Sequence, residues 1–437
     1  MTAMGYTLAA FGLILLLSRL KVPLSVAILT GAAALGVLFG LGSGQIGSAA
    51  LAGATRPNSI GLLVITILLL ALSQSMRAGG QLEQIVSLAR AFLRRPAVAM
   101  AALPALIGLL PMPGGALFSA PMVEAAAGGS ESSGRLSAIN YWYRHLWEYW
   151  WPLYPGVILA AEWTARPLEV FIAQQLPLGL FMAASGVVIF RGLHQDLRAT
   201  GALAQEGTKR RLLRSTSSIW IILIVWAVGT VAARLVFAHM GLGAEQLKAR
   251  ENLSALSKYG PLTVALVASL VWTARLNGIG PGGLAKVFAG RSLYDLAVLV
   301  LSVMVFGQLL ETTNAGWRIG GELQALEIAP ILVVGALPFI AGMVTGLAVG
   351  FVGVSFPIVL EVVRAMSEGG ATSAYMVLAY ACGHLGMMLS PLHLCHIVSN
   401  RYFNTTFGPV YRRIIPAAAI MFVLAVGYFG LLRLLGL

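Results

Sequence analysis

Residues 141–154 read YWYRHLWEYWWPLY and place Arg144, His145 and Glu148 in an apolar segment with eight aromatic side chains. Pro152 near its end has no backbone N–H to donate and breaks a helix. An ionisable group at membrane depth is costly unless it is paired or faces a cavity, and such groups mark transport pathways. The segment therefore predicts a functional site in a membrane-spanning helix that is broken at Pro152.

The composition is that of a polytopic membrane protein. Of the 437 residues, 58% are hydrophobic and 10% are charged, whereas soluble domains carry about 25% charged residues. The net charge of +13 is better explained by basic cytoplasmic loops and anionic lipid headgroups than by nucleic acid. The two cysteines, Cys382 and Cys395, indicate no disulfide framework. The first apolar run is expected to be a span rather than a signal peptide.

Apolar runs that approach the ~20 residues needed to cross a bilayer fall into two sets. A basic linker, residues 191–216, separates the sets and is expected in the cytoplasm. The first set is residues 4–20, 22–41, 58–76, 139–160 and 168–190, and the second is residues 217–239, 260–276, 293–312, 373–398 and 414–436. We therefore predict an all-α polytopic protein with five transmembrane helices in each half.

An apolar stretch of another kind lies between the third and fourth runs of each set. Residues 96–127 are interrupted by Pro111-Met112-Pro113-Gly114-Gly115. Each arm would reach roughly 20 Å, short of the ~30 Å hydrocarbon core. Residues 329–366 carry glycines in the segment 345–354, where their tip is expected. Non-helical backbone at this depth survives only inside protein or beside water, so both stretches are predicted to be re-entrant hairpins.

The same order of elements occurs twice in the chain. Three runs, an amphipathic piece, a hairpin, a broken span and a last span make up each half, with the amphipathic pieces at residues 81–95 and 312–328. His145-Leu146-x5-Pro152-Leu153 in the first half matches His384-Leu385-x5-Pro391-Leu392 in the second. Five crossings per half is an odd number, so the halves are predicted to be inverted repeats, as in many secondary transporters.

The basic residues agree with this inversion. With the linker in the cytoplasm and both termini outside, 20 Lys and Arg residues lie inside and 9 outside. This is the bias that the positive-inside rule demands. We therefore expect a multi-pass protein of the inner (plasma) membrane, with the first hairpin entering from the cytoplasm and the second from outside.

The broken span of the first half, residues 139–160, holds the charged candidates. On a continuous helix Arg144, His145 and Glu148 would share one face, at spacings of three and four. Pro152 would free backbone carbonyls beside the carboxylate, and such a group of ligands suits a cation or a proton. The alternative is structural, with an Arg144–Glu148 ion pair that locks the helix and His145 hydrogen-bonded beside it.

The broken span of the second half, residues 373–398, keeps His384 and Pro391 but not the charges. One coupling site is therefore expected, in the first half. His393 and His396 follow Pro391 at a spacing of three, which can bind a metal. The chain has no HExxH motif and no carboxylate near these histidines. No metal site is predicted, and proton handling and polar packing stay open for the pair.

The hairpin tips supply the other candidate ligands. Gly114 and Gly115 permit close approach of the backbone, while Ser119, Thr345 and Ser355 add hydroxyl groups. Half-helix N-termini at such tips can hold an anionic group. Na+ is a candidate ligand near Gly114, Ser119, Thr345 and Ser355. The alternative is that the glycines only allow close helix packing.

Two motifs give the chain a family resemblance. LLPMPGGALFSAP at residues 109–121 and NYWYRHLWEYWWPLYPG at residues 140–156 resemble an uncharacterised ten-span integral membrane family, domain of unknown function 401, of the ion-transporter superfamily. Relatives in that superfamily include citrate, gluconate and divalent-anion symporters and Na+/H+ antiporters. The likeness covers nearly the whole chain.

The resemblance implies an elevator-type transporter, often a homodimer. Its scaffold domain would comprise residues 1–80 and 217–312, and its transport domain residues 81–190 and 313–437. The divalent-anion symporters carry a Ser-Asn-Thr signature at their hairpin tips that binds substrate and sodium. Neither tip of this chain has it, so only the positions of the tips and of the breaks carry over.

We therefore expect a secondary active transporter, not an enzyme, that moves a small organic anion, expected to be a carboxylate, with coupling to H+ or Na+. Arg144 would be the counter-charge to the anion, and His145 and Glu148 would titrate during the cycle. No cofactor is expected, and the expected partners are the anion, membrane lipid and a second copy, without nucleic acid. Three alternatives stay open: a Na+/H+ antiporter, a lipid-carrier flippase and, from another class, an intramembrane hydrolase.

Overall fold

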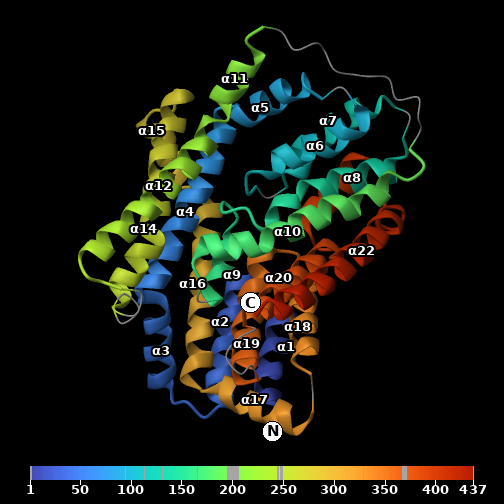
Figure 1. Ribbon diagram of the computed structural model, residues 1–437. Coiled ribbons are helices and arrows are strands. Elements are labelled where there is room, and N and C mark those ends of the chain that lie inside the picture. The colour runs from blue at the N-terminus through green and yellow to red at the C-terminus, as the bar shows by residue number, and fades with distance from the viewer. Residues whose placement is uncertain are drawn as a thin grey trace.

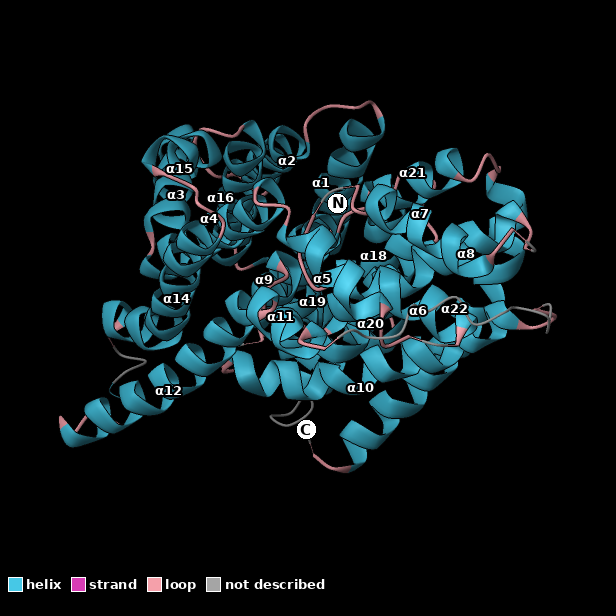
Figure 2. Cartoon of the chain, turned by 90° about the horizontal axis from the view of Figure 1, so that it is seen from above, coloured by secondary structure: helices cyan, strands magenta, loops and turns pink. Residues whose placement is uncertain are grey.

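The protein is all-helical. The computed structural model describes residues 2–93, 95–112, 114–129, 131–164, 166–193, 206–243, 246, 250–327, 329–366 and 372–436. These residues form 21 α-helices and two short 3-10 helices, with no β-strand among them (Figure 2). The prediction of an all-α protein is confirmed.

Two series of helices follow each other along the chain. The first series is α1 (Ala3–Arg19), α2 (Leu24–Leu38), α3 (Ser43–Thr55), α4 (Pro57–Ala78), α5 (Gln81–Arg90), α6 (Pro96–Gly108), α7 (Ala116–Ala127), α8 (Ser133–Arg144), η1 (Leu146–Tyr149), α9 (Pro155–Trp163), α10 (Leu168–Gly186) and η2 (Val187–Phe190). The second series, after α11 (Thr208–Ser215), is α12 (Ser217–His239), α14 (Glu251–Leu276), α15 (Pro281–Phe288), α16 (Arg291–Thr312), α17 (Ala315–Ala325), α18 (Pro330–Thr345), α19 (Ala348–Met366), α20 (Thr372–Met388), α21 (Leu394–Tyr402) and α22 (Phe407–Leu434).

Helices of the two series pack into two groups that lie side by side (Figure 2). In the first group α2 and α3 pack on α16, and α14 packs on both α4 and α12. In the second group the hairpin α6–α7 packs on α8, the hairpin α18–α19 packs on α20, and α10 packs on α22. Because both groups combine helices from both series, neither half of the sequence forms a separate body.

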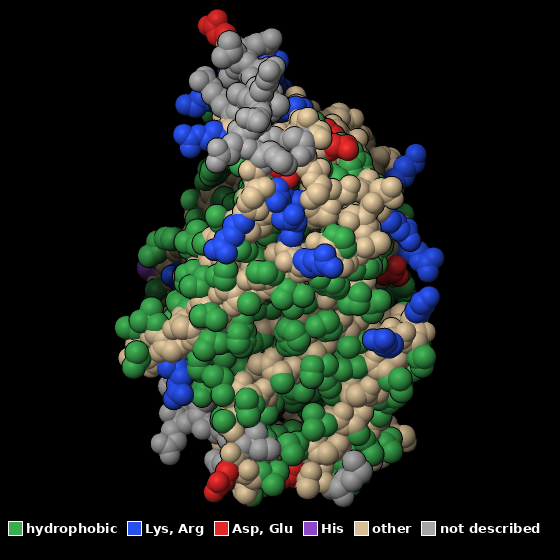
Figure 3. Space-filling view, turned by 90° about the vertical axis from the view of Figure 1, so that its right-hand side faces the viewer, with side chains coloured by type: hydrophobic (Ala, Val, Ile, Leu, Met, Phe, Trp, Pro, Cys, Tyr) green, Lys and Arg blue, Asp and Glu red, His purple; other side chains and the backbone are tan. Residues whose placement is uncertain are grey.

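The long helices are those of a membrane protein. By length and composition, the described helices that could cross a membrane are α4, α10 with η2, α12, α14, α16, α19 and α22. Figure 3 shows a broad band of hydrophobic side chains on one face, with many of the visible Lys and Arg side chains nearer its upper end. Multi-pass insertion into a membrane follows from these surfaces, because lipid is the solvent that such a band requires.

Proline and glycine set many helix boundaries. Pro57, Pro96 and Pro155 each occupy the first turn of a helix, where a backbone N–H would have no partner inside the helix. Gly128 and Gly346 follow the last turns of α7 and α18 with φ angles of 62° and 61°. This left-handed conformation closes a helix and strongly favours glycine.

The first hairpin is short in both arms. α6 has 13 residues and α7 has 12, so each is about 20 Å long or less. Residues 109–115 join the arms, and Gly114 turns the chain there with a φ of 69°. Pro113 of the tip motif lies outside the described residues. An arm of this length does not reach across the ~30 Å hydrocarbon core.

The second hairpin differs from its prediction. Its turn is confined to Gly346 and Leu347, and α19 already begins at Ala348, so the prediction of a tip over residues 345–354 is wrong. Gly350 and Gly353 lie inside α19, where they serve close packing. A Cβ on Gly353 would overlap the side chain of Val303 on α16. With 19 residues, α19 is about 28 Å long, longer than a re-entrant arm needs.

Some helices have no counterpart among the predictions. α3 and α15 occupy the same place in their series, before the third long helix, and have 13 and 8 residues. Their glycine-rich sequences show too little apolar periodicity to predict a span. α1, with 17 residues, is as long as the predicted run at 4–20, whereas α2, with 15, is shorter than the predicted run at 22–41.

Candidate functional site

Both broken helices are interrupted around the prolines that the sequence singles out. α8 ends at Arg144, η1 follows, and the chain is not helical again until Pro155, so Pro152 lies in the gap. α20 ends at Met388 and α21 begins at Leu394, which leaves Pro391 in the second gap. Proline cannot donate the hydrogen bond that would continue either helix.

Two tyrosines tie each broken helix to the gap of the other. The Tyr141 hydroxyl of α8 donates to the carbonyl of Met388 at 3.0 Å. The Tyr380 hydroxyl of α20 donates to the carbonyl of Glu148 at 2.7 Å. The two gaps therefore face each other inside the second group of helices. Sequence reasoning missed both tyrosines, although each lies four residues before a histidine of the repeated motif.

The side chain of Arg144 contacts the first hairpin rather than Glu148. Its Nη2 atom donates to the carbonyl of Met112 at 2.7 Å, and its side chain is buried. Gly115 makes this contact possible, because a Cβ there would overlap the guanidinium group. The shared helical face of Arg144 and Glu148 is not formed, because α8 ends at Arg144 and η1 redirects the chain. The predicted arrangement, with an Arg144–Glu148 ion pair as its structural alternative, is therefore wrong.

Glu148 lies between histidines of both broken helices. Its Oε1 atom is 3.8 Å from Nε2 of His145, and its Oε2 atom is 4.0 Å from Nε2 of His384. All three residues are buried. Neither ring nitrogen of His384 has a hydrogen-bond partner in the described part of the chain. Carboxylate oxygens and neutral imidazole nitrogens are groups that can bind a cation.

Ser119 joins a polar network where α7, α8 and α21 cross. Its hydroxyl donates to Oδ1 of Asn140 at 2.6 Å, and Nδ2 of Asn140 donates to the carbonyl of Ala116 and to Ser399 at 3.0 Å each. Asn400 accepts from Ser137 at 2.6 Å. Sequence reasoning missed Asn140, Ser399 and Asn400, since polar residues in a broken span have no periodicity of their own.

The other hydroxyls at the tips are bound to their own helices. Thr345 donates to the carbonyl of Ala341 at 2.8 Å, and Ser355 donates to the carbonyl of Phe351 at 2.7 Å. Ser355 is fully buried inside α19. These two side chains are not gathered with Arg144 and Glu148, so the structure divides the predicted site residues between a first-hairpin cluster and the second hairpin.

A cleft of about 1120 Å³ separates the first group of helices from the hairpin tips. Pro111 and Met112 of the first tip and Leu347 of the second line it, together with parts of α2, α4, α15 and α16. Its charged lining residues are Arg77, Lys286, Arg291 and Asp295. The cleft thus carries more positive than negative charge and reaches the tip residue whose carbonyl holds Arg144.

Two of the cleft cations have no carboxylate partner among the residues that the structure describes. Arg291 lies 3.8 Å from Asp295, whereas no ion pair to Arg77 or Lys286 occurs within the described residues. The Arg77 guanidinium lies over the ring of Phe118 on α7, 4.9 Å from its centroid. Cations of this kind attract an anion to a cleft with low-dielectric walls.

Fold and surface define a helical, multi-pass membrane protein with two hairpins and two broken helices. The family model described as Protein of unknown function (DUF401) matches residues 6–206 and 256–432. These segments cover most of the chain, and the protein belongs to this family. A comparison with curated proteins finds no match.

Proposed function

We propose that this protein is a secondary active transporter that moves a small organic anion, a carboxylate, across the inner membrane. The observation that carries the proposal is the cleft lined by both hairpin tips and by Arg77, Lys286 and Arg291. Carboxylates are bound in proteins by cationic side chains and by backbone N–H groups at helix N-termini.

Arg144 supports an anion site at the first tip. It is a buried cation that donates to a neutral carbonyl, that of Met112, and is hydrogen-bonded to the Tyr154 side chain, while its Nε atom has no partner within the described residues. A buried charge without an opposite charge in contact is costly. An anion at the tip would complete the hydrogen bonding of this guanidinium group.

Two inverted repeats account for the order and the packing of the helices. α2 packs on α16 and α14 packs on α4. The second long helix of each series therefore packs on the third long helix of the other series. α7 packs on α21 and α9 packs on α19 in the same reciprocal way. The hairpins α6–α7 and α18–α19 lie toward opposite ends of the molecule (Figure 1). This is the pattern expected of repeats related by an axis in the membrane plane.

This arrangement supports an elevator-like movement as part of the proposal. The first group of helices would be the scaffold and the second group the body that moves, with the cleft between them. The two groups are linked by two ion pairs, a partly buried one between Glu162 and Lys258 and an exposed one between Glu169 and Arg234. The exposed pair breaks at modest cost, because exposed ion pairs contribute about 0–1 kcal/mol each.

Coupling to H+ or Na+ is assigned to the surroundings of Glu148. This carboxylate lies at the end of a broken helix, beside backbone that is not helical and beside His145 and His384. Half-helix ends and unwound backbone at the midplane hold coupling ions in many transporters. The same geometry favours the second candidate function, a Na+/H+ antiporter without an organic substrate.

A thermal-shift screen of the purified protein separates these candidates. Organic acids are tested one at a time, with sodium and pH varied. A ligand that binds only the folded state raises the apparent melting temperature. The transporter proposal predicts stabilisation by at least one carboxylate, reduced in Arg77→Gln and Lys286→Gln. Stabilisation by sodium with no response to any organic acid would favour the antiporter.

A further inference from the structure

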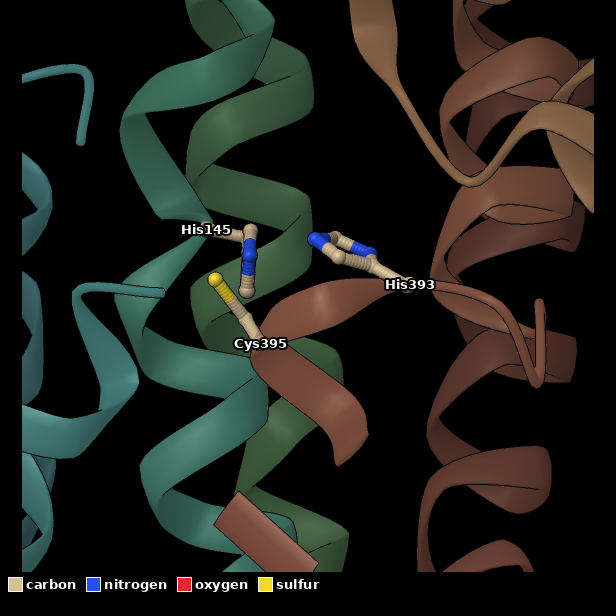
Figure 4. Close-up of side chains that lie close together, drawn as sticks. All are labelled: His145, His393 and Cys395. Carbon is tan, nitrogen blue, oxygen red and sulfur yellow. The ribbon is translucent and has the colours of Figure 1, made fainter. Parts of the chain in front are cut away.

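Three metal-ligating side chains meet between the two broken helices. His145 follows the last residue of α8, while His393 and Cys395 lie at the start of α21. One ligand atom from each side chain lies within 4.8 Å of the others, and the three side chains point toward one another (Figure 4). All three are buried, with exposed fractions of 0%, 5% and 5%. In the sequence, His145 lies 248 positions before His393 (393 − 145) and 250 before Cys395 (395 − 145).

Both imidazole rings are held so that one nitrogen stays free. Nδ1 of His145 donates to the carbonyl of Tyr141 at 2.6 Å. The Tyr141 hydroxyl donates to a carbonyl, so it accepts from Nδ1 of His393 at 2.9 Å. Nε2 of each ring is then the unprotonated nitrogen, and that of His145 has no hydrogen-bond partner in the described chain. Carbonyl and hydroxyl partners on the second nitrogen orient metal-binding histidines in the same way.

The ligand types indicate the kind of metal. Two imidazoles and a thiolate are a ligand set for Zn2+, which binds histidine nitrogen at 2.0–2.1 Å and cysteine sulfur at about 2.3 Å in a tetrahedron. Ligand atoms of such a site are about 3.5 Å apart, so a closure of roughly 1 Å would form it. Glu148 lies beside this group, with its Oε1 atom 3.8 Å from Nε2 of His145, but it is not among the converging ligand atoms.

We propose that His145, His393 and Cys395 bind a zinc-class divalent metal ion. Cys395 binds as the thiolate, and the proton of its thiol is released to solvent when the metal–sulfur bond forms. The thiolate of Cys395 then offsets one of the two charges of the ion. Because His145 directly follows α8 and the other two ligands lie at the start of α21, the ion ties the two broken helices together at their gaps.

His396 is not part of this site. Its ring stacks on Tyr141, with centroids 4.5 Å apart, and it is absent from the group of converging ligand atoms. The sequence pattern pairs His393 with His396 and predicts no metal. The structure pairs His393 with His145 instead, a neighbour that only the fold brings near.

Metal content and cobalt substitution test the proposal. The full-length protein is purified with a tag free of histidine, and its zinc is measured by inductively coupled plasma mass spectrometry before and after a chelator. Co2+ is then added to the apo protein. The expected result is one metal per chain and a near-ultraviolet charge-transfer band from the cobalt–thiolate bond. Binding of Zn2+ should also raise the melting temperature.

Cysteine variants assign the band to its ligand. Cys395→Ser should lose the charge-transfer band, while Cys382→Ser, which removes the other buried cysteine, should keep it. A folded wild-type protein that binds neither Zn2+ nor Co2+ overturns the proposal, whatever the variants do. A full band in Cys395→Ser also overturns it. These readouts do not depend on transport, so they stand or fall apart from the proposed function.

Discussion

The two broken helices share a backbone plan but not their charges. Tyr141 and Tyr380 lie four residues before His145 and His384, and each tyrosine donates across to the gap of the other helix. The position of Arg144 in the motif is held by Gly383 in the second helix. In the same register, Met387 stands opposite Glu148. The break and the tyrosine contact therefore occur in both helices, whereas the cation and the carboxylate occur only in the first.

Packing explains why the second helix can do without the arginine. Arg144 extends to the tip of the first hairpin and holds the carbonyl of Met112. At Gly383 the absence of a side chain admits the ring of Phe351 from the second hairpin, which a Cβ would overlap. One hairpin thus meets its broken helix through a buried charge, and the other through an aromatic ring. The two helices thus share the position of their breaks, while the buried charged side chains occur in only one of them.

The largest effect should come from removing the single carboxylate. Glu148→Gln keeps the shape of the side chain and removes its charge. The ion-coupled uptake of the transported carboxylate into proteoliposomes should therefore fall by more than 100-fold. Met387→Leu, at the matching position of the second helix, should keep uptake within about twofold, because volume-conserving apolar exchanges are tolerated. Gel filtration and melting temperature check that both variants are folded. Full ion-driven uptake by Glu148→Gln would remove this carboxylate from the mechanism.

A methyl group at the first tip should displace the arginine. Gly115→Ala places a Cβ where the guanidinium group of Arg144 lies, so Arg144 must leave the carbonyl of Met112. We expect uptake to fall at least tenfold. Gly427→Ala in α22, where a Cβ meets nothing within 4 Å, is the control. It should leave uptake unchanged, since alanine favours a helix by about 1 kcal/mol over glycine. Equal uptake by the two variants would contradict the contact.

A third prediction concerns the polar network around Asn140. Asn140→Ala removes the hydrogen bonds of Asn140 to Ser119, to the carbonyl of Ala116 and to Ser399 at a buried helix crossing, and each such bond contributes about 0.5–1.5 kcal/mol. The melting temperature in detergent should drop accordingly. In the same register the second half has Ala379, and Ala379→Gly is the matched control at the apolar crossing, with a loss of about 1 kcal/mol. A larger loss in the control would mean that the network adds little.

The smallest expected effect is that of one tyrosine hydroxyl. Tyr380→Phe removes the hydrogen bond to the carbonyl of Glu148 and should lower the free energy of unfolding by about 1 kcal/mol. Tyr141→Phe should cost more, because this hydroxyl contacts both Met388 and His393. Thermal denaturation of the two variants in one detergent measures the difference. A lower stability of Tyr380→Phe than of Tyr141→Phe would contradict the assignment of two hydrogen bonds to the Tyr141 hydroxyl and one to that of Tyr380.

Helix content and helix breaks follow closely from local sequence. Apolar runs of about 20 residues locate the long helices, and Pro152 and Pro391 lie in gaps because proline acts on its own turn of backbone. The turn at Gly114 is equally local, since glycine tolerates its φ of 69°. The glycines at 350 and 353 led to a wrong prediction of the tip because their role is not local. Whether a glycine breaks a helix or lets another helix approach depends on neighbours such as Val303, which are distant in sequence.

The chemistry of the site depends on contacts that the spacing of residues in the sequence does not predict. Arg144 and Glu148 are four residues apart, which suits a pair on a continuous helix, but the helix ends at Arg144. The partner of Arg144 is a carbonyl in a hairpin 32 residues earlier in the chain. The meeting of His145 with Cys395 is likewise a product of the crossing of α8 and α21. Only the repeated Tyr-x3-His-Leu pattern was available as a further signal from the sequence.

Solute counterflow in proteoliposomes tests the central claim most directly. Vesicles loaded with an unlabelled organic acid are diluted into the labelled acid, and accumulation is followed for a panel of mono-, di- and tricarboxylates. The account predicts transient accumulation of at least one carboxylate by the wild-type protein and its loss in Gly115→Ala, with Gly427→Ala behaving as wild type. No accumulation of any acid by folded, correctly inserted protein, or equal accumulation by both glycine variants, would contradict it.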